Sequence, residues 1–415
     1  MSQPADNYDV IVIGGGASGM MAAGRAAERG KRVLLIERNR RLGEKLRITG
    51  GGRCNITNAE PDEHVLLARF GDAEPYLHSA FAKFGVKDTF AFFEKLGLPL
   101  AVQARNRAFP VSEKAADVEA ALERYISAHG VQVRTSTPVT RIESDGNRIT
   151  GVVAGSELLT ASQYILATGG LSHPETGSKG DGFTWLSALG HRVTDPTPTI
   201  VPLRIEESWV RQFAGISVPQ MKITFSVDNK KKGSFIGPLL FTHFGISGPT
   251  ILNAAGKVAD WLEEGIVTAR VDLFPGMDLG ILDKHLAEVF REHSNKGLRN
   301  ALREVAPPGS SDLILSLAPQ IDQEQKVHSL SKENRRVLAE VMKGIPLTVK
   351  GLMGFERAVV ADGGLQIEEV DMRTMRSKKF DNLLVTGDVL HITRPSGGYS
   401  LQLCWTTGYL AGENV

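Results

Sequence analysis

The stretch YDVIVIGGGASGMMAAGRAAERGKRVLLIER, near the N-terminus, constrains the fold of this 415-residue chain more than any other. An apolar run of strand type, residues 10–13, leads directly into Gly14, Gly16 and Gly19 in the order G-x-G-x-x-G. An Ala-rich helical stretch, a second apolar run and an acidic residue, Glu37, follow at the spacing of one strand–helix–strand unit. The sequence therefore predicts a dinucleotide-binding unit at the start of the chain.

Each glycine of this turn has its own steric reason. Gly14 permits the tight turn out of the strand, Gly16 leaves room for a pyrophosphate beside the backbone, and Gly19 lets the helix pack closely on the sheet. The helix that follows presents unpaired N–H groups and a partial positive charge to the phosphates. Glu37 is expected to accept hydrogen bonds from a ribose, and a carboxylate there favours a free 2′-hydroxyl over a 2′-phosphate.

The composition is that of an ordinary globular protein, with 42% hydrophobic and 23% charged residues. Its 48 basic and 47 acidic side chains give a formal net charge of +1, so no global attraction to nucleic acid or to a membrane surface follows. No apolar run is long enough to span a bilayer, and the N-terminus lacks a secretory signal pattern. Two cysteines without a C-x-x-C pair fit a reducing compartment. We expect a cytoplasmic protein, a monomer or homodimer, without a metal site.

Residues 38–58, RNRRLGEKLRITGGGRCNITN, are cationic and Gly-rich. Placed directly after the ribose-binding acid, such a segment can fold back along a diphosphate and a second ring system, and Thr49, Arg53 and Asn55 could supply hydrogen bonds to it. The string ITGGGRCNITN resembles the signature of the BaiN-like (YhiN-type) NAD(P)/FAD-dependent oxidoreductase family. Further matching strings extend almost to the C-terminus, so the resemblance covers the whole chain. These strings are ATGG at 167–170, SHPETGSKGDG at 172–182, FTHFGISGP at 241–249, VTGD at 385–388 and SGGYS at 396–400.

The resemblance implies an α/β fold: a Rossmann-like FAD domain of the two-dinucleotide-binding type, with an inserted antiparallel β-barrel and a helical subdomain. Prolines near residue 195 mark a change to short strand-like runs, and a Leu and Val spacing of helical type follows from residue 278. We therefore expect a discontinuous FAD domain at 1–194 and 344–415, a barrel at 195–275 and a helical subdomain at 276–343. Ser247 is expected to be the N-cap of a helix that Gly248 and Pro249 open.

FAD is the expected tightly held cofactor, because the chain carries Glu37, the ATGG string and the late GD and GGYS strings together. No second G-x-G-x-x-G follows a strand, so NADH or NADPH is expected to dock transiently as the reductant. The resemblance implies that the backbone of Val139 meets the adenine and that Asp388 holds the ribityl chain. A helix starting after Gly397 and Gly398 would stabilise negative charge on the flavin pyrimidine. The predicted cofactor-binding residues are Gly14, Gly16, Ala17, Ser18, Gly19, Glu37, Arg38, Lys45, Thr49, Gly51, Gly52, Arg53, Cys54, Asn55, Val139, Ala167, Thr168, Gly169, Gly387, Asp388, Gly397, Gly398, Tyr399 and Ser400.

The expected chemistry is hydride transfer from the flavin to an electron-poor carbon, with a protein acid protonating the neighbouring carbon. His243, Cys54 and His391 are the candidates for that acid, and Arg53 or Arg394 for holding an oxyanion. Each has a structural alternative: a histidine can be a hydrogen-bonded structural group, and Cys54 can be a small packing residue.

Three substrate classes remain open. The favoured hypothesis is NAD(P)H-driven reduction of an activated C=C bond in a small molecule, as in the bile-acid reductases of the family. The second is an RNA-modifying flavoenzyme, because the family includes a ribosomal RNA dihydrouridine synthase. The third is an amine oxidase of the aminoacetone type, which passes electrons to oxygen. A non-catalytic nucleotide-binding role is the least favoured, because the flavin-side motifs would then have no purpose.

Overall fold

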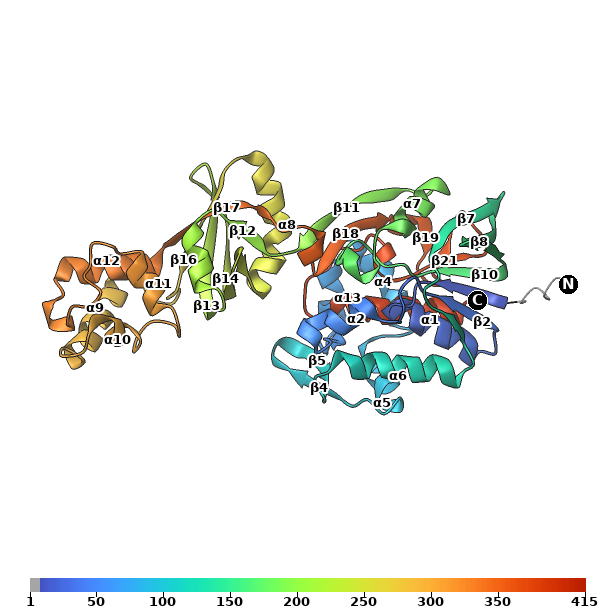
Figure 1. Ribbon diagram of the computed structural model, residues 1–415, viewed down its shortest axis with the longest axis horizontal. Helices are drawn as coiled ribbons and strands as arrows, with labels where there is room; N and C mark the ends of the chain where they lie inside the picture. The colour runs from blue at the N-terminus through green and yellow to red at the C-terminus, as the bar shows by residue number, and fades with distance from the viewer. Residues whose placement is uncertain (1–7) are drawn as a thin grey trace. The chain divides into compact units, whose positions relative to one another are not determined.

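The computed structural model describes residues 8–415, which form two compact units (Figure 1). Unit 1 comprises the chain up to Thr197 together with Val359–Val415, and unit 2 comprises Pro198–Ala358. Each unit has its own hydrophobic core. Unit 1 contains the glycine-rich turn, so unit 2 is an insertion between two parts of the dinucleotide-binding unit.

Unit 1 is built on a seven-stranded sheet of order β19-β20-β21-β10-β1-β2-β6. The neighbours from β21 to β6 pair in parallel, and β19 and β20 add an antiparallel edge. Because parallel strands end at the same edge of a sheet, the segments after β1, β2, β10 and β21 meet there. The bounds are β1 Tyr8–Ile13, β2 Val33–Ile36, β6 Gln132–Arg134, β10 Ala161–Leu166, β19 Val370–Asp371, β20 Arg376–Ser377 and β21 Leu383–Val385.

Helix α1 (Ala17–Glu28) lies against this sheet and also packs on α6 (Ala115–Ala128) and on the C-terminal helix α13 (Tyr399–Glu413). In Figure 1, α1 and α6 lie on the side of the parallel strands opposite to β7 and β8. The remaining helices of unit 1 are α2 Glu44–Ile48, α3 Glu63–Leu67, α4 Glu74–Phe81, α5 Val86–Lys95 and α7 Asp181–Ala188.

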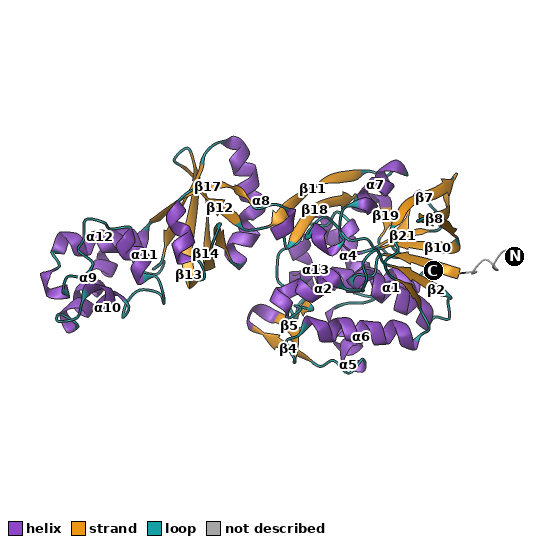
Figure 2. Ribbon diagram, in the orientation of Figure 1, coloured by secondary structure: helices purple, strands orange, loops and turns teal. Residues whose placement is uncertain are grey.

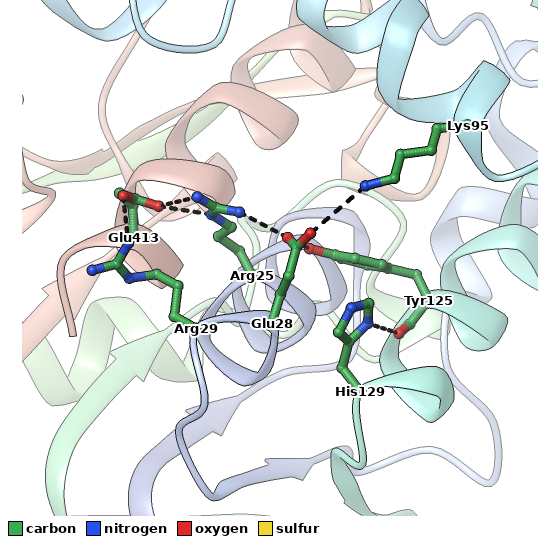
Figure 3. A network of polar contacts seen from close by, with 7 residues as sticks. All are labelled: Arg25, Glu28, Arg29, Lys95, Tyr125, His129 and Glu413. Carbon is green, nitrogen blue, oxygen red and sulfur yellow. Dashed lines mark hydrogen bonds and ion pairs between the residues drawn. The ribbon is translucent and has the colours of Figure 1, made fainter.

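A chain of polar contacts ties these helices together (Figure 3). Arg25 of α1 binds Glu28 at 2.8 Å and Glu413 of α13 at 2.6 Å, and Glu28 also accepts a hydrogen bond from the Tyr125 hydroxyl of α6 at 2.9 Å. The Lys95 ammonium lies 3.8 Å from Glu28, so α5 is also connected to this network. Burial of Arg25 opposes its charge, yet the hydrogen bonds that its guanidinium donates to Glu28 and Glu413 raise its pKa, so the guanidinium stays charged.

Three small sheets complete unit 1. A hairpin joins β7, which ends at Asp145, to β8, which begins at Arg148. The sheets are β3 Thr57–Asn58 with β5 Arg107–Pro110 and β4 Leu100–Gln103, β7 Val139–Asp145 with β8 Arg148–Ala154 and β9 Glu157–Leu159, and β11 Val193–Ile200 with β18 Val360–Leu365.

Unit 2 contains the predicted antiparallel barrel, closed in the order β12-β15-β14-β13-β16-β17. The last strand, β17, begins at Ile345 and pairs with β12 and β16. The expected return to the FAD domain at 344 therefore does not coincide with the structure, in which residues 345–352 close the barrel. The other strands are β12 Leu203–Ile205, β13 Ser217–Val227, β14 Lys230–Thr242, β15 Gly245–Ser247, β16 Val267–Asp272 and β17 Ile345–Leu352.

The helices of unit 2 follow the predicted helical stretches, and Figure 2 shows α9 to α12 gathered apart from the barrel strands. Ser247 is not the N-cap of α8: it ends β15, and Gly248, with a φ of +99°, takes that position. Few L side chains adopt this φ, so glycine is the residue that fits there. The bounds are α8 Pro249–Glu264, α9 Leu279–Glu292, α10 Leu298–Leu302, α11 Ser311–Ser316 and α12 Lys332–Lys343. Within residues 8–415, no helix has the length and apolar character that a membrane crossing requires.

Candidate functional site

The glycine turn joins β1 to α1, and its glycines face different surroundings. Gly14 has a φ of +106°, and a Cβ there would lie 2.5 Å from the carbonyl oxygen of Ala167. A Cβ on Gly19 would lie 1.9 Å from the carbonyl oxygen of Gly14, so this glycine lets the helix contact the turn. A Cβ on Gly16 would meet nothing within 4 Å. Gly16 therefore borders open space at the first turn of α1, where N–H groups favour an anion.

Glu37 lies directly beside this turn. Its Oε2 accepts a hydrogen bond from the backbone N–H of Gly15 at 2.7 Å, and its Oε1 accepts one from that of Asn39 at 2.8 Å. The N–H of Thr137 donates to the carbonyl oxygen of Glu37 at 2.9 Å. The segment just before Val139 therefore lies beside Glu37. The residues predicted to meet the ribose and the adenine thus lie in neighbouring segments.

Lys45, on α2, connects the cationic segment to the C-terminal part of the chain. Its ammonium lies 3.3 Å from the hydroxyl of Ser172 and 3.6 Å from Oδ2 of Asp388. The guanidinium of Arg394 forms a second ion pair with Asp388. Burial opposes ionisation of Asp388, but the charges of Arg394 and Lys45 lower the pKa of its carboxyl group. Asp388 is therefore a carboxylate held between two cations.

The turn before α13 lies against β3. A Cβ on Gly398, which has a φ of +105°, would lie 2.3 Å from the carbonyl carbon of Thr57. The Asn58 side-chain amide donates to the carbonyl oxygen of Gly397 at 3.2 Å. A Cβ on Gly387 would lie 2.4 Å from the hydroxyl of Ser18. Three segments therefore converge within unit 1: the ITGGGRCNITN string, the turn before α13 and the glycine turn.

Three buried polar atoms in these segments have no hydrogen-bond partner within residues 8–415: Oδ1 of Asn55, Oγ1 of Thr168 and Nδ1 of His391. Buried polar groups are normally paired, so unpaired ones point to a ligand. Together with the open space at Gly16, they fit a dinucleotide cofactor. Gly169, with a φ of +73°, follows Thr168, and a Cβ there would lie 3.5 Å from the Lys45 ammonium.

The remaining predicted cofactor residues also lie in these segments. Arg38 pairs with Asp181 at the start of α7 and donates to the carbonyl oxygen of Gly177 at 3.3 Å. The hydroxyl of Thr49 donates to the carbonyl oxygen of Lys45 at 3.0 Å. Ala17 and Ser18 open α1, Tyr399 and Ser400 open α13, and Gly51 and Gly52 are exposed in the turn after α2.

The candidate acids occupy three different environments. The thiol of Cys54 is fully buried, and burial raises its pKa, so the thiol does not reach a substrate in this arrangement. His391 is half-buried, and its Nδ1 is one of the three unpaired atoms. His243 belongs to unit 2, where it is an exposed residue of the two-residue turn between β14 and β15. Of the three, the structure brings Cys54 and His391 into the segments that converge on the glycine turn.

The two candidate oxyanion holders also differ. The side chain of Arg394 is 1% exposed, and all three of its nitrogens donate: to Ser400 at 2.7 Å, to the carbonyl oxygen of Ile392 and to Asp388. This arrangement positions Asp388 and leaves the guanidinium no surface for a substrate. Arg53 is more open: its guanidinium lies 4.4 Å from the centroid of the Phe109 ring and 3.3 Å from Glu113.

Gly15, Asn58 and Arg107 lie in these segments but were not among the predicted site residues. A Cβ on Gly15 would lie 2.3 Å from the Leu42 side chain, and the Gly15 N–H binds Glu37, so Gly15 is as constrained as its neighbours. Asn58 is the last residue of the ITGGGRCNITN string, which was a signal for it. Arg107 gives a weaker signal, a charged residue next to the apolar pair Ala108 and Phe109.

Comparison with known proteins agrees with this geometry. The family described as HI0933-like protein Rossmann domain matches residues 8–414. The chain is 29% identical over 409 residues to the 3-dehydro-bile acid delta(4,6)-reductase of Clostridium scindens, with 97% of each chain covered. It is 27% identical over 418 residues to the ribosomal RNA dihydrouridine synthase of Escherichia coli, with 99% of this chain and 98% of that protein covered.

Among solved structures, the 3-ketosteroid-delta4-(5alpha)-dehydrogenase of Rhodococcus jostii RHA1 matches with a TM-score of 0.54 at 14% identity. The match covers 99% of this chain and 97% of that one, and it shows a shared fold. The family match spans nearly every described residue and includes the glycine turn, Glu37 and the turn before α13. The chain therefore belongs to the HI0933-like family of FAD-dependent oxidoreductases.

Proposed function

We propose that this protein uses NADH or NADPH to reduce an activated C=C bond of a small molecule. The observation that carries the proposal is the convergence of the glycine turn, the Lys45–Asp388–Arg394 ion pairs and three unpaired buried polar atoms in one part of unit 1. The two full-length relatives support the choice of reaction, since a delta(4,6)-reductase and a dihydrouridine synthase both, by name, add hydrogen across a C=C bond.

FAD, when bound, would supply the hydride. The chain's own residues would bind and orient it: N–H groups at Gly16 toward the phosphates, Glu37 toward the ribose, and Asp388, fixed by Lys45 and Arg394, toward the ribityl hydroxyls. His391 is the proposed proton donor, because its Nδ1 is buried and has no hydrogen-bond partner among residues 8–415. A histidine can deliver a proton near neutral pH.

A small-molecule substrate is preferred to RNA on charge. The chain carries 48 basic and 47 acidic side chains, whereas proteins that bind nucleic acid nonspecifically carry a clear excess of positive charge. RNA modification is the second candidate, because one relative is a ribosomal RNA dihydrouridine synthase.

The test is an anaerobic experiment on the FAD-loaded protein. The flavin is first bleached with NADPH or NADH, and then a conjugated ketone, such as 2-cyclohexenone or a 3-oxo-Δ4 steroid, is added. Return of the flavin absorbance, with a product that has gained two hydrogens, supports the proposal. If the flavin absorbance returns only with ribosomal RNA transcribed in vitro, which lacks dihydrouridine, the protein is an RNA-modifying enzyme, the second candidate. If neither the ketone nor the RNA reoxidises the flavin, and hydrogen peroxide forms when an amine is added in air, the protein is an amine oxidase.

A further inference from the structure

A cluster of positive charge, formed by Arg53, Arg105 and Arg107, lies at the small sheet β3-β5-β4 of unit 1. Strand β5 begins with Arg107, which pairs with Asn58 of β3 and with Gln103 of β4. Because directly paired residues of antiparallel strands project from the same face, these three side chains share one face of the sheet. Phe109, two residues further along β5, faces the same way.

Two segments of the FAD site lie against this face. The Asn58 amide binds the carbonyl oxygen of Gly397 at 3.2 Å, and a Cβ on Gly397 would lie 3.9 Å from Nε of Arg107. The Arg53 guanidinium covers the ring of Phe109 at 4.4 Å from its centroid. Arg107 therefore lies beside both the turn before α13 and the end of the Gly50–Gly52 turn.

The charges on this face are not balanced. In the described part of the chain, neither Arg105 nor Arg107 forms an ion pair with a carboxylate. Glu113 pairs with Arg53 at 3.3 Å, and Glu60 accepts a hydrogen bond from the side chain of Asn106 at 3.2 Å. Burial, followed by the charges of Arg105 and Arg53, lowers the pKa of the Arg107 guanidinium. Arg105 also adopts a φ of +64°, which non-glycine residues rarely do. Arg107 is half-buried beside two more exposed arginines, and the free-energy cost of placing its charge there would be offset by an anion.

We propose that Arg107, assisted by Arg105 and Arg53, binds an oxyanion of the substrate, a carboxylate or a phosphate, beside the flavin. A guanidinium presents planar, paired N–H donors that match the two oxygens of such a group. The inference rests on the proposed function, because it takes the turn before α13 to line the flavin. It adds a requirement: the preferred substrate carries a negative charge as well as an activated C=C bond.

The test measures anion binding to the FAD-loaded protein as a rise in Tm, at constant ionic strength set with chloride. The probes are sodium benzoate for a carboxylate and inorganic phosphate for a phosphate. The variants are Arg107→Gln, which removes the charge, and Arg107→Lys, which keeps the charge without the planar donor pair. Arg373→Gln, at an exposed turn of the same unit, is the control for a loss of one positive charge.

We expect one of the two probes to raise the Tm of the wild-type protein, and Arg107→Gln to weaken that effect about tenfold in apparent Kd. Arg107→Lys is expected to retain part of the binding, and Arg373→Gln all of it. Whichever probe binds more tightly identifies the substrate oxyanion as carboxylate or phosphate. Equal binding in wild type and Arg107→Gln, or no binding of either probe to the wild type, overturns the inference.

Failure of this inference and failure of the proposed function give different results. A protein that holds FAD and is reduced by NADPH, but shows no anion effect on Tm, refutes only the oxyanion site. A protein without a flavin absorbance band refutes the proposed function. The Tm measurement on that same protein would still show whether Arg107 binds anions.

Discussion

At the scale of single residues, Gly16 and Gly19 belong to one motif but have different roles: Gly16 leaves space for the cofactor, and Gly19 allows the helix to pack on the turn. Alanine at Gly19 would bring a Cβ to 1.9 Å from a backbone oxygen, whereas alanine at Gly16, where φ is −81°, would project into open space. We expect Gly16→Ala to change the free energy of unfolding of the FAD-free protein by less than about 1 kcal/mol. Its Kd for FAD should rise at least about tenfold, because the new methyl group occupies the space of the pyrophosphate.

The matched variant Gly19→Ala should behave in the opposite way. Its Cβ contacts backbone that cannot move cheaply, so the FAD-free protein itself should lose about 2 kcal/mol of stability. Urea unfolding without FAD and fluorescence titration with FAD measure the two effects separately. Equal loss of stability in both variants would contradict the assignment of Gly16 to the phosphates.

His391 provides a second residue-scale prediction. If its Nδ1 side delivers the proton, His391→Gln should slow the reoxidation of the reduced enzyme by substrate about 10²- to 10⁴-fold. Reduction of the flavin by NADPH should be unaffected, because that step does not use the acid. His129→Gln, whose ring binds the carbonyl oxygen of Tyr125, is the control. An unchanged reoxidation rate in His391→Gln would remove His391 from the reaction.

Ser377, His191 and Glu369 form a buried arrangement that resembles the catalytic triad of a serine hydrolase. Nδ1 of His191 lies 2.9 Å from Glu369, and Nε2 lies 3.0 Å from the Ser377 hydroxyl. That hydroxyl also accepts the backbone N–H groups of Lys379 and Phe380, each at 3.0 Å, so its proton must point toward the histidine. Both lone pairs of this buried hydroxyl accept backbone N–H groups, so the serine is not available as a nucleophile, and the three residues are a structural link.

The same link predicts a dependence of stability on pH. Burial keeps His191 neutral by lowering its pKa. Burial opposes the charge of Glu369, yet hydrogen bonds from Arg192 and His191 lower its pKa from 4.5 to about 2. The folded state therefore binds fewer protons than the unfolded state, and this stabilisation is complete above about pH 6.5 and lost as the pH falls.

The test compares the free energy of unfolding of wild type and Glu369→Gln at several pH values. The difference between them should be up to about 3 kcal/mol at pH 7 and should shrink as the pH falls from 4.5 toward 2. Glu368→Gln, at the exposed neighbouring position, should show no such trend. A difference that does not vary with pH would refute the role given to the Glu369 carboxylate.

At the scale of elements, the contact between α1 and α13 depends on two glycines one helical turn apart. A Cβ on Gly408 would lie 2.5 Å from the carbonyl oxygen of Ser18, and one on Gly412 would lie 2.4 Å from that of Ala22. The two helices thus approach closely enough that any side chain would intrude. The C-terminal helix is in this way fixed on the helix that begins at the glycine turn.

Gly412→Ala should destabilise the protein by about 1 to 3 kcal/mol despite the better helix propensity of alanine. Gly256→Ala in α8 is the matched control, because a Cβ there meets nothing within 4 Å. That control should stabilise by up to about 1 kcal/mol. Urea unfolding of both variants measures these changes in the free energy of unfolding. Stabilisation by Gly412→Ala would show that the helices are not in close contact.

The sequence predicted elements well where one residue determines local geometry. The β1–α1–β2 unit and the barrel are present as expected. Predictions that depended on pairing between distant strands were less accurate. The strand after residue 344 could not be assigned to the barrel from its own residues, because its place is set by pairing with β12 and β16. For the same reason, the position of Arg107 beside Gly397, 290 positions further along the chain, could not be predicted from local sequence.

At the scale of the whole molecule, the chain uses one continuous insertion to separate two halves of a cofactor-binding unit. The strand β21 and the helix α13 come after the insertion, yet β21 pairs with β10 and α13 packs on α1. The proposed FAD site therefore requires segments from before and after the insertion. A protein cut within unit 2 would retain the glycine turn but would depend on reassociation for Asp388 and for the turn before α13.

The central claim is that reducing equivalents pass from NAD(P)H through FAD to a C=C bond. The most direct measurement is an anaerobic single turnover with NADPH deuterated at the transferring position and a conjugated, carboxylate-bearing ketone. We predict that the flavin absorbance bleaches and returns in proportion to the ketone added, with a saturated product that has gained two hydrogens. A flavin that bleaches but does not return with the ketone, or returns without a saturated product, would contradict the account.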